Sequence, residues 1–365
     1  MTFTSFTEKV ASWQRNHGRH DLPWQVDRTP YRVWVSEIML QQTQVVTVLA
    51  YYGRFLQHFP DVFTLANAPV EAVLSLWAGL GYYSRARNLH RCARELVLRH
   101  GGRFPATATE LAALPGIGKS TAAAISAFCN GERVAILDAN VKRVLVRYHA
   151  VHGDIRSAAT ERQLWSLADR SVSSLADVQS LSPYTQGLMD LGAMVCTPRR
   201  PLCQQCPLAA ECCALAQGIV DRLPVRAAAR ATRTARAMWL LQGVDADGRV
   251  FLIRRGDQQI WGGLYCLPDY CDRETAVAAG QALGWELQAE LAPVSHTLTH
   301  LDLSIHRLVY RSDSKRGRKG GLHGYWVTRE QLHTYGLPAP VKRMLQLPVA
   351  ASRGGAQIVK NDSNK

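Results

Sequence analysis

Glu37 is a carboxylate set into an apolar helical pattern, and this combination can do acid chemistry. The pattern covers residues 31–40, and Trp34, Ile38 and Val45 fall on the side of the helix that carries Glu37. Burial disfavours the charged form of a carboxyl group and raises its pKa, which is the condition for donating a proton near neutral pH. A buried glutamate paired with an arginine would give the same pattern, and the residues alone leave the two interpretations equal.

Asp138 is a second carboxylate, placed where an apolar segment meets a helix. It follows residues 134–137, which are all apolar, and precedes a helical pattern that begins with Ala139 and Asn140. Aspartate is a preferred helix N-cap, and capping is the simpler interpretation of an isolated residue of this kind. An N-cap and a catalytic carboxylate are compatible roles for one side chain, so both are kept.

Two glycines, Gly116 and Gly118, stand directly before an alanine-rich helical pattern. Pro115 and Gly116 predict a tight hairpin, because glycine adopts backbone angles that other residues disfavour. Backbone N–H groups at the start of the following helix, near Lys119 and Ser120, could then bind an anion such as a phosphate. Two glycines in this spacing are weak evidence when taken alone.

Amide and aromatic side chains gather in two further segments. Gln41 and Gln42 end the helix that carries Glu37, and Tyr82 lies in a segment rich in glycine, tyrosine and arginine, residues 79–87. Amides can replace hydrogen bonds lost when a base leaves a duplex, and an aromatic ring can wedge between bases. A solvated helix edge and ordinary packing are the simpler alternatives.

Four cysteines, Cys196, Cys203, Cys206 and Cys212, leave gaps of six, two and five residues. Thiolates bind iron–sulfur clusters or zinc, and four in one short loop can close a small site. Zinc sites usually contain two separated Cys-x-x-Cys pairs, whereas this loop has one, so the spacing favours a cluster and leaves zinc open. The adjacent Cys213 could compete with Cys212 as a ligand.

The chain of 365 residues is long enough for two domains, and its formal net charge of +14 favours a polyanionic partner. Helical patterns fill the first part, residues 1–217, which includes the cysteine loop 196–212. An arginine-rich segment, 218–236, is predicted to be a basic linker. Strand-like segments then alternate with a short helix over residues 237–348, an α+β pattern similar to the Nudix fold but without its acidic metal-binding helix. Residues 349–365 are predicted to be a disordered tail.

The motifs together resemble the helix-hairpin-helix DNA glycosylases, and the whole chain resembles the MutY-type adenine DNA glycosylases among them. The resemblance rests on residues 36–43, on the hairpin with Asp138, on the cysteine spacing and on the C-terminal region. It implies a mostly α helix-hairpin-helix core with a [4Fe–4S] cluster loop, followed by a Nudix-like domain. It also implies removal of adenine opposite 8-oxoguanine or guanine in double-stranded DNA.

The resemblance assigns roles residue by residue. Glu37 matches the acid that protonates N7 of the extruded adenine, Asp138 the carboxylate that stabilises the sugar cation, and Asn140 a residue that orients Asp138 or water. The four cysteines match the cluster ligands. The expected DNA contacts are Gln41, Gln42, Tyr82, Gly116, Gly118, Lys119 and Ser120.

Two substitutions refine these expectations. Relatives that also cleave the strand have a catalytic lysine where this chain has Ser120, so the resemblance implies a monofunctional enzyme that leaves an abasic site. In the C-terminal domain, Leu298, Thr299 and His300 match a Phe-Ser-His loop that contacts 8-oxoguanine. Since Leu298 replaces the aromatic residue, the preference for 8-oxoguanine over guanine is expected to differ in size.

Other functions remain as alternatives. An endonuclease III-like glycosylase for oxidised pyrimidines conflicts with Ser120, and a non-catalytic iron–sulfur DNA-binding protein conflicts with the presence of both Glu37 and Asp138. A nucleotide pyrophosphatase conflicts with the missing acidic helix. No segment resembles a signal peptide or reaches the roughly 18 apolar residues of a membrane span. We therefore expect a monomeric bacterial protein of the cytoplasm, associated with the nucleoid, that does not contact membranes.

Overall fold

The computed structural model describes residues 3–226, 233–312 and 322–346. Contacts divide the chain into two units, residues 1–234 and 235–365, and each is described by itself. The predicted disordered tail, 349–365, and residues 227–232 of the predicted linker lie outside the described residues. None of the described helices is long and apolar enough to cross a bilayer.

The first unit is built from helices joined by short loops. Its α-helices are α1 (Phe3–His17), α2 (Pro23–Val26), α3 (Pro30–Leu40), α4 (Val45–His58), α5 (Val62–Asn67), α6 (Val70–Trp77), α7 (Ser84–His100), α8 (Ala108–Ala112), α9 (Lys119–Asn130), α10 (Ala139–Tyr148), α11 (Ala158–Ser173), α12 (Leu181–Asp190) and α13 (Cys213–Ala216). A π-helical turn, Leu191–Val195, continues α12, and short 3₁₀ turns cover Cys203–Gln205, Ala209–Glu211 and Val220–Arg222.

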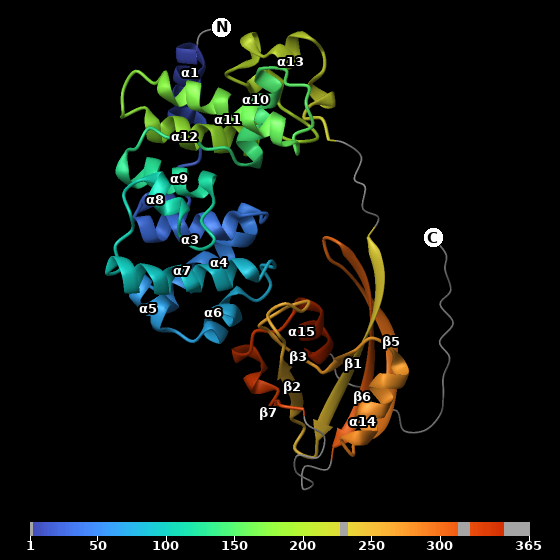
Figure 1. Cartoon of the computed structure of the whole chain (residues 1–365). Coiled ribbons are helices and arrows are strands. Elements are labelled where there is room, and N and C mark those ends of the chain that lie inside the picture. Colours follow the sequence, from blue (N-terminus) through green and yellow to red (C-terminus); the bar gives the residue numbers. More distant parts are fainter. Residues whose placement is uncertain (1–2, 227–232, 313–321, 347–365) are drawn as a thin grey trace. The chain divides into compact units, whose positions relative to one another are not determined.

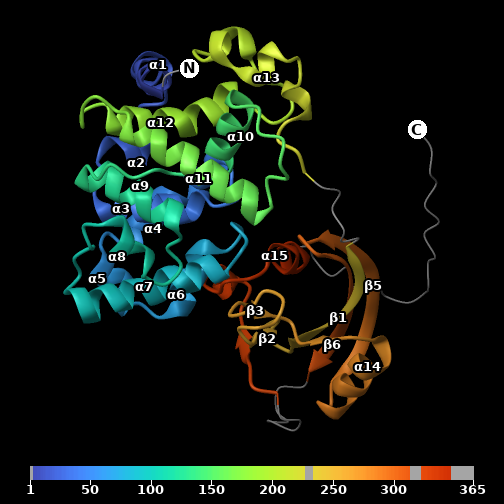
Figure 2. The same ribbon diagram turned by 45° about the horizontal axis from the view of Figure 1, so that its top comes forward.

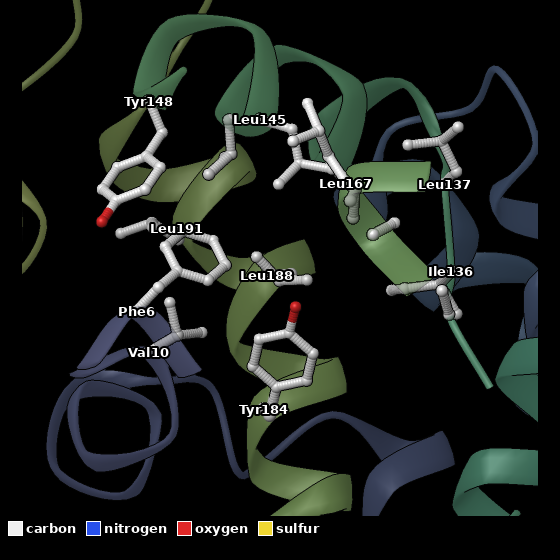
Figure 3. Packing of buried hydrophobic residues seen from close by; sticks show 14 of the residues in the cluster. Phe6, Val10, Ile136, Leu137, Leu145, Tyr148, Leu167, Tyr184, Leu188 and Leu191 are labelled. Carbon is white, nitrogen blue, oxygen red and sulfur yellow. The ribbon is translucent and has the colours of Figure 1, made fainter. Parts of the chain in front are cut away.

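These helices form two groups with α9 between them (Figures 1 and 2). One group contains α3 to α7, and the other contains α1 and α10 to α13. The second group has a continuous core in which Phe6 and Val10 of α1 pack against Tyr148, Tyr184 and their neighbours (Figure 3). Ile136 and Leu137 are also buried in this core. Their burial fixes the segment that leads to Asp138.

Local sequence signals explain where the helices that carry the site begin. The Thr29 side chain caps α3 by accepting a hydrogen bond from the Arg32 N–H, and Pro30 occupies the first helical turn. The predicted hairpin joins α8 to α9, with Gly116 at a φ of +77° and Gly118 as the residue before α9. A Cβ atom at Gly116 would lie 2.6 Å from Cβ of Asn88, so only glycine fits this turn.

The predicted linker 218–236 differs along its length in the structure. Its first residues pack on the helical unit: Leu223 is buried, its carbonyl accepts from Arg147, and the Val225 carbonyl accepts from the Ile155 N–H. Strand β1 begins at Thr234. A linker between Val225 and Thr234 therefore stays a prediction.

The described residues of the second unit form a seven-stranded sheet and two α-helices. Its strands are β1 (Thr234–Asp245), β2 (Val250–Arg254), β3 (Tyr265–Cys266), β4 (Asp269–Tyr270), β5 (Glu286–Thr297), β6 (Leu301–Ser312) and β7 (Tyr325–Val327). The main order is β3-β2-β1-β6-β5, with β4 on β1 and β7 on β2. Strands β5 and β6 form a long antiparallel hairpin, and the register between them shifts at two places.

The helices of the second unit are α14 (Arg273–Ala282) and α15 (Ala339–Gln346), with a 3₁₀ turn at Glu330–Thr334. Ala276 of α14 packs with Leu241, Trp285 and Tyr310 in one hydrophobic cluster. Helix α14 is short and has a single acidic residue, Glu274, as the sequence indicated. The acid pairs that a Nudix hydrolase uses to hold metal are thus absent from the described helix at this place.

Candidate active site

A pocket of about 450 Å³ in the first unit brings the predicted catalytic residues together. Glu37 reaches it from the last turns of α3, and Asp138 and Asn140 reach it from the start of α10. The two carboxylates are far apart in the sequence, and they meet because α3 and α10 belong to the two helix groups on either side of α9. The other lining residues are Arg19, Leu22, Trp24, Gln25, Arg28, Val33, Ser36, Leu40, Thr43, Gln44, Val45, Phe128, Gln186, Met189 and Ala193.

Glu37 is held as an acid. Burial raises the pKa of Glu37 to about 8, and the negative charge of Asp138 acts in the same direction, while the positive charge of Arg28 opposes it. Among the described residues, none forms a hydrogen bond with the Glu37 carboxyl group within normal distance. The raised pKa favours the protonated form of this carboxyl group near neutral pH, and Glu37 lines the pocket.

Asp138 has a different environment, although burial raises its pKa as well. Its carboxylate caps α10 by accepting a 2.7 Å hydrogen bond from the Val141 N–H, and the Asn140 N–H also favours the ionised form. The nearby charges of Arg143 and Lys142 act in the same direction, as does the positive end of the helix dipole. Asp138 thus has the donors and cations that stabilise a carboxylate, and Glu37 has few of them.

Asn140 is fixed by Arg143 one turn further along α10. The Arg143 guanidinium donates to Oδ1 of Asn140 (2.8 Å) and to the carbonyl of Gly192 (2.5 Å) in the π-helical turn. It also donates to the carbonyl of Cys196 (2.6 Å). A Cβ atom at Gly192 would lie 2.6 Å from Cβ of Asn140, so the turn and α10 approach as closely as glycine allows.

The four predicted cluster ligands line one small pocket in the loop that follows the π-helical turn. Cys213 does not line it. Within the described residues, no three Cys, His, Asp or Glu side chains converge on one point as ligands of a single ion must. A four-iron cluster binds each thiolate through a different iron, so its ligands stand further apart than those of zinc. The residues present therefore fit a [4Fe–4S] cluster.

The predicted DNA-contact residues lie on three loops of the first unit and in the first turn of α9. Gln42 and Tyr82 are exposed and both have a positive φ, +57° and +48°, while Gln41 is half-buried and its amide donates to Thr121. Ser120 accepts a 3.0 Å hydrogen bond from the Leu137 N–H, next to Asp138. The Lys119 ammonium group lies over the ring of Trp165, 3.7 Å from its centre.

The predicted lesion-recognition residues lie in the second unit, in the turn between β5 and β6. Thr299 and His300 are exposed, and Leu298 is half-buried with its N–H donating to the carbonyl of Leu301. Beside this turn, the ring of Trp261 lies 6.0 Å from that of His296.

Sequence reasoning missed the polar wall of the pocket. Arg28 donates to Ser182 and to the Gln186 side chain, whose amide in turn donates to the buried Asp190. Gln25 differs, since both polar atoms of its amide are buried without a hydrogen-bond partner in the described structure. No local pattern marks these residues, because they come from α2, α12 and the adjoining loops.

The raised pKa of Glu37 predicts a pH-dependent gain in stability for Glu37→Gln. Between the ordinary glutamate pKa and about 8, the folded protein keeps the Glu37 proton while the unfolded chain releases it, so stability is lost as pH rises. Glutamine avoids this loss. Thermal unfolding should give a difference in Tm, variant minus wild type, that grows from about pH 4.5 to about pH 8 and then levels off. Glu8→Gln, which removes an exposed carboxylate on α1, is the matched control, and a difference independent of pH for Glu37→Gln would contradict the assignment.

Three family profiles match the chain. Residues 35–170 match the HhH-GPD superfamily of base excision DNA repair proteins, residues 196–212 match the iron–sulfur binding domain of endonuclease III, and residues 238–347 match the NUDIX domain. They confirm the expected fold class, a helical helix-hairpin-helix core with a [4Fe–4S] loop and a C-terminal Nudix-like domain. The profile match and the fit of the four thiols agree on the cofactor.

Full-length relatives match as well. An adenine DNA glycosylase of Buchnera aphidicola subsp. Acyrthosiphon pisum is 32% identical, with 95% of this chain and 98% of the relative covered. The adenine DNA glycosylase of Homo sapiens is 33% identical, with 94% of this chain and 74% of the relative covered. Among solved structures, a thermostable thymine-DNA glycosylase is 28% identical with a TM-score of 0.53, covering 59% of this chain and 97% of that one. The chain belongs to the adenine DNA glycosylases, enzymes of base excision repair that hydrolyse N-glycosyl bonds in DNA.

Proposed function

We propose that this enzyme removes adenine paired with 8-oxoguanine, and more slowly adenine paired with guanine, and that it works as a monomer and leaves an abasic site. The observation that carries the mechanism is the pair of carboxylates in one pocket. Burial raises the pKa of both groups, but Asp138 also has backbone donors and the nearby charges of Arg143 and Lys142, which oppose that shift, whereas only the charge of Arg28 opposes the shift of Glu37. Hydrolysis of a glycosidic bond needs one protonated and one ionised carboxyl group.

Glu37 acts first, as the general acid. It donates its proton to N7 of the extruded adenine. Adenine can then leave as a neutral base, which is a better leaving group than the anion. The glycosidic bond then breaks and positive charge develops on the sugar. Asp138 stabilises that charge, and its own ionisation becomes more favourable as the cation forms beside it. The Glu37 carboxylate, having lost its proton, activates the water that completes hydrolysis.

Asn140 and the cluster loop support these steps without taking part in proton transfer. The Asn140 amide orients Asp138 or the water, and Arg143 fixes that amide. Cys196, Cys203, Cys206 and Cys212 would hold the [4Fe–4S] cluster, which would cross-link the loop that carries them. Since Arg143 also binds the carbonyl of Cys196, the cluster loop stabilises the start of α10.

Ser120 and Lys119 support a monofunctional reaction. A Schiff base at the sugar needs a free amine, and the hydroxyl of Ser120 instead binds the backbone beside Asp138. The amine of Lys119 lies on the ring of Trp165, and that of Lys142 pairs with Glu161 at 2.7 Å. Neither amine is aimed at the pocket, and neither lines it.

Several loops supply the proposed DNA contacts. Gly116 and Gly118 present the start of α9 to a phosphate, with Lys119 and Ser120 beside it, and Gln41, Gln42 and Tyr82 contact the duplex around the extruded base. In the second unit, the exposed Thr299 and His300 offer hydrogen bonds to 8-oxoguanine, and Leu298 provides apolar contact.

Gln25 supports selection of adenine. A buried amide without partners costs roughly 1–3 kcal/mol, and the ligand of the pocket can relieve that cost. Adenine carries an amino group at N6 beside the acceptor N1, which matches the oxygen and the nitrogen of one amide. We propose that Gln25 binds this edge of the base while N7 remains accessible to Glu37.

The acid role of Glu37 predicts a pH profile for excision. Under single-turnover conditions, the rate should be constant near neutral pH and fall about tenfold per unit above pH 8, because the protonated fraction of Glu37 falls. Glu37→Gln should reduce the rate at least 100-fold, since general acids typically contribute about 10²–10⁴. A wild-type rate that rises from pH 7 to pH 9 would contradict the acid role.

The substrate and the reaction type are tested on four duplexes: adenine opposite 8-oxoguanine, adenine opposite guanine, adenine opposite thymine, and an oxidised pyrimidine opposite guanine. We expect strand breaks only after alkali treatment, fastest with 8-oxoguanine and slower with guanine. Borohydride should trap no covalent complex with wild type. Breaks without alkali would contradict the monofunctional reaction, and equal rates opposite 8-oxoguanine and guanine would contradict the proposed lesion preference.

The contact to N6 is tested by comparing Gln25→Leu with wild type on adenine and on purine, which lacks the amino group. The ratio of adenine to purine excision should fall about fivefold in the variant, the value of a hydrogen bond of about 1 kcal/mol. The glycosidic bonds of adenine and purine differ in intrinsic stability, but this difference is the same for both proteins and cancels when their ratios are compared. Gln25→Leu should unfold at a temperature equal to or above that of wild type, because it removes two unpaired polar atoms. An unchanged ratio would refute the contact.

A further inference from the structure

Arg85 is a buried arginine at the start of α7 that binds two separate loops. The residue is 9% exposed, and no carboxylate of the described chain forms an ion pair with it. Five of its six hydrogen bonds go to main-chain carbonyls and the sixth to the hydroxyl of Thr43. Burying a cation in this way is unfavourable unless its surroundings provide many acceptors, so the carbonyls must compensate for the lost water.

The first loop is the C-terminal end of α3. One guanidinium nitrogen, Nη1, donates to the carbonyls of Ile38 (2.7 Å), Met39 (2.9 Å) and Gln41 (2.6 Å). The last carbonyls of a helix have no partners within the helix, and the helix dipole makes this end negative. Arg85 therefore acts as the C-terminal cap of the helix that carries Glu37.

The second loop joins α6 to α7. The other nitrogen of Arg85, Nη2, donates to the carbonyls of Leu80 (3.4 Å) and Gly81 (3.2 Å), and to Oγ1 of Thr43 (3.2 Å). Trp77 supports the same loop, since its indole N–H donates to the Gly81 carbonyl and its ring lies under the Arg85 guanidinium. One guanidinium plane thus connects both loops.

Each of the two loops presents one exposed side chain at a strained backbone position. Gln42 follows the carbonyls bound by Nη1, and Tyr82 follows those bound by Nη2. Both are non-glycine residues with positive φ, an arrangement that persists only where neighbouring contacts hold it. Arg85 supplies contacts on both sides, and its guanidinium lies 5.6 Å from the centre of the Tyr82 ring.

We propose that Arg85 is a positioning residue that locks the loops of Gln42 and Tyr82 in one fixed relation, so that both side chains enter the duplex together when adenine is extruded. This inference rests on the proposed DNA contacts of Gln42 and Tyr82. Arginine is required because its two terminal nitrogens donate in one plane in two directions, whereas a lysine ammonium can serve only one loop. A displacement of about 1 Å at such a site can cost about 100-fold in rate.

Arg85→Lys tests the positioning role because it keeps the positive charge and removes the planar guanidinium group that binds both loops. Arg99→Lys, at the exposed end of the same helix, is the matched control. The first readout is the fluorescence of a 2-aminopurine placed beside the 8-oxoguanine, because this fluorescence rises when the 2-aminopurine is unstacked. The second readout is the single-turnover rate of adenine release. Arg85→Lys should abolish most of the fluorescence rise and lower the rate tenfold or more. Affinity for an undamaged duplex should stay within about twofold, and Arg99→Lys should match wild type.

A double-mutant cycle separates positioning from other causes. If Arg85 acts through the loops, the double variant Arg85→Lys/Tyr82→Ala should release adenine less than twofold more slowly than Tyr82→Ala alone. If the two substitutions acted independently, their rate losses would multiply in the double variant. Multiplying effects, or an unchanged fluorescence rise in Arg85→Lys, would overturn the proposal. Thr43→Val, which removes one acceptor, should weaken the fluorescence rise in the same direction. It decides the question if Arg85→Lys does not fold.

The cycle also distinguishes this proposal from the proposed function. Wild type that releases no adenine would refute the reaction itself. Adenine release with an unaffected Tyr82→Ala variant would leave the reaction intact and overturn the positioning role, because Tyr82 would then not enter the DNA.

Discussion

Arg143 makes the interaction on which the active site depends. Its guanidinium joins Asn140 at the start of α10, Gly192 in the π-helical turn and the carbonyl of Cys196. Asp138 caps the same helix, so its position follows that of α10. Cys196 is the first of the four proposed cluster ligands, and the position of the proposed catalytic carboxylate is therefore connected to the cysteine loop through one side chain. This connection supports a structural role for the cysteine loop, since hydrolysis of an N-glycosyl bond involves no electron transfer.

The pocket places two carboxyl groups in different surroundings. Burial disfavours the charge on both Glu37 and Asp138. They differ in the groups that stabilise a negative charge: Asp138 has the N–H groups of a helix start and the charges of Arg143 and Lys142, and Glu37 has the charge of Arg28. The negative charge of Asp138 also adds to the pKa of Glu37, so the state of each group supports that of the other.

Buried arginines without carboxylate partners recur in the first unit. Arg85, Arg143 and Arg147 all donate mainly to main-chain carbonyls, and Arg147 binds those of Thr197, Pro198 and Leu223 around the cluster loop. In each case the acceptors include carbonyls of loops or of the last turn of a helix, which have no partner within regular secondary structure. The loops that carry the proposed DNA contacts, the cluster and the end of α12 are thus held by the same device, which fixes backbone without adding opposite charge near DNA.

The sequence by itself determined the local parts of this protein. Gly116 requires a turn that only glycine can adopt, the spacing of four cysteines favours a cluster, Asp138 caps the helix that follows it, and Glu37 stands among apolar neighbours. Each of these signals depends on residues close together in the chain, where backbone conformation is decided by nearby side chains. The alternation of strands and the short helix α14 in the C-terminal unit could be predicted for the same reason.

Only the tertiary structure decided which of these parts meet. It placed Glu37 and Asp138 in one pocket, left the amide of Gln25 without a partner among the described residues, and brought Arg85 and Arg143 to loops far away in sequence. No pattern could indicate the arginine contacts, because their acceptors are main-chain carbonyls, which every residue has. The type of a residue that binds main-chain carbonyls therefore does not indicate which carbonyls it binds. Only the packing of helices from the two groups determines these partners.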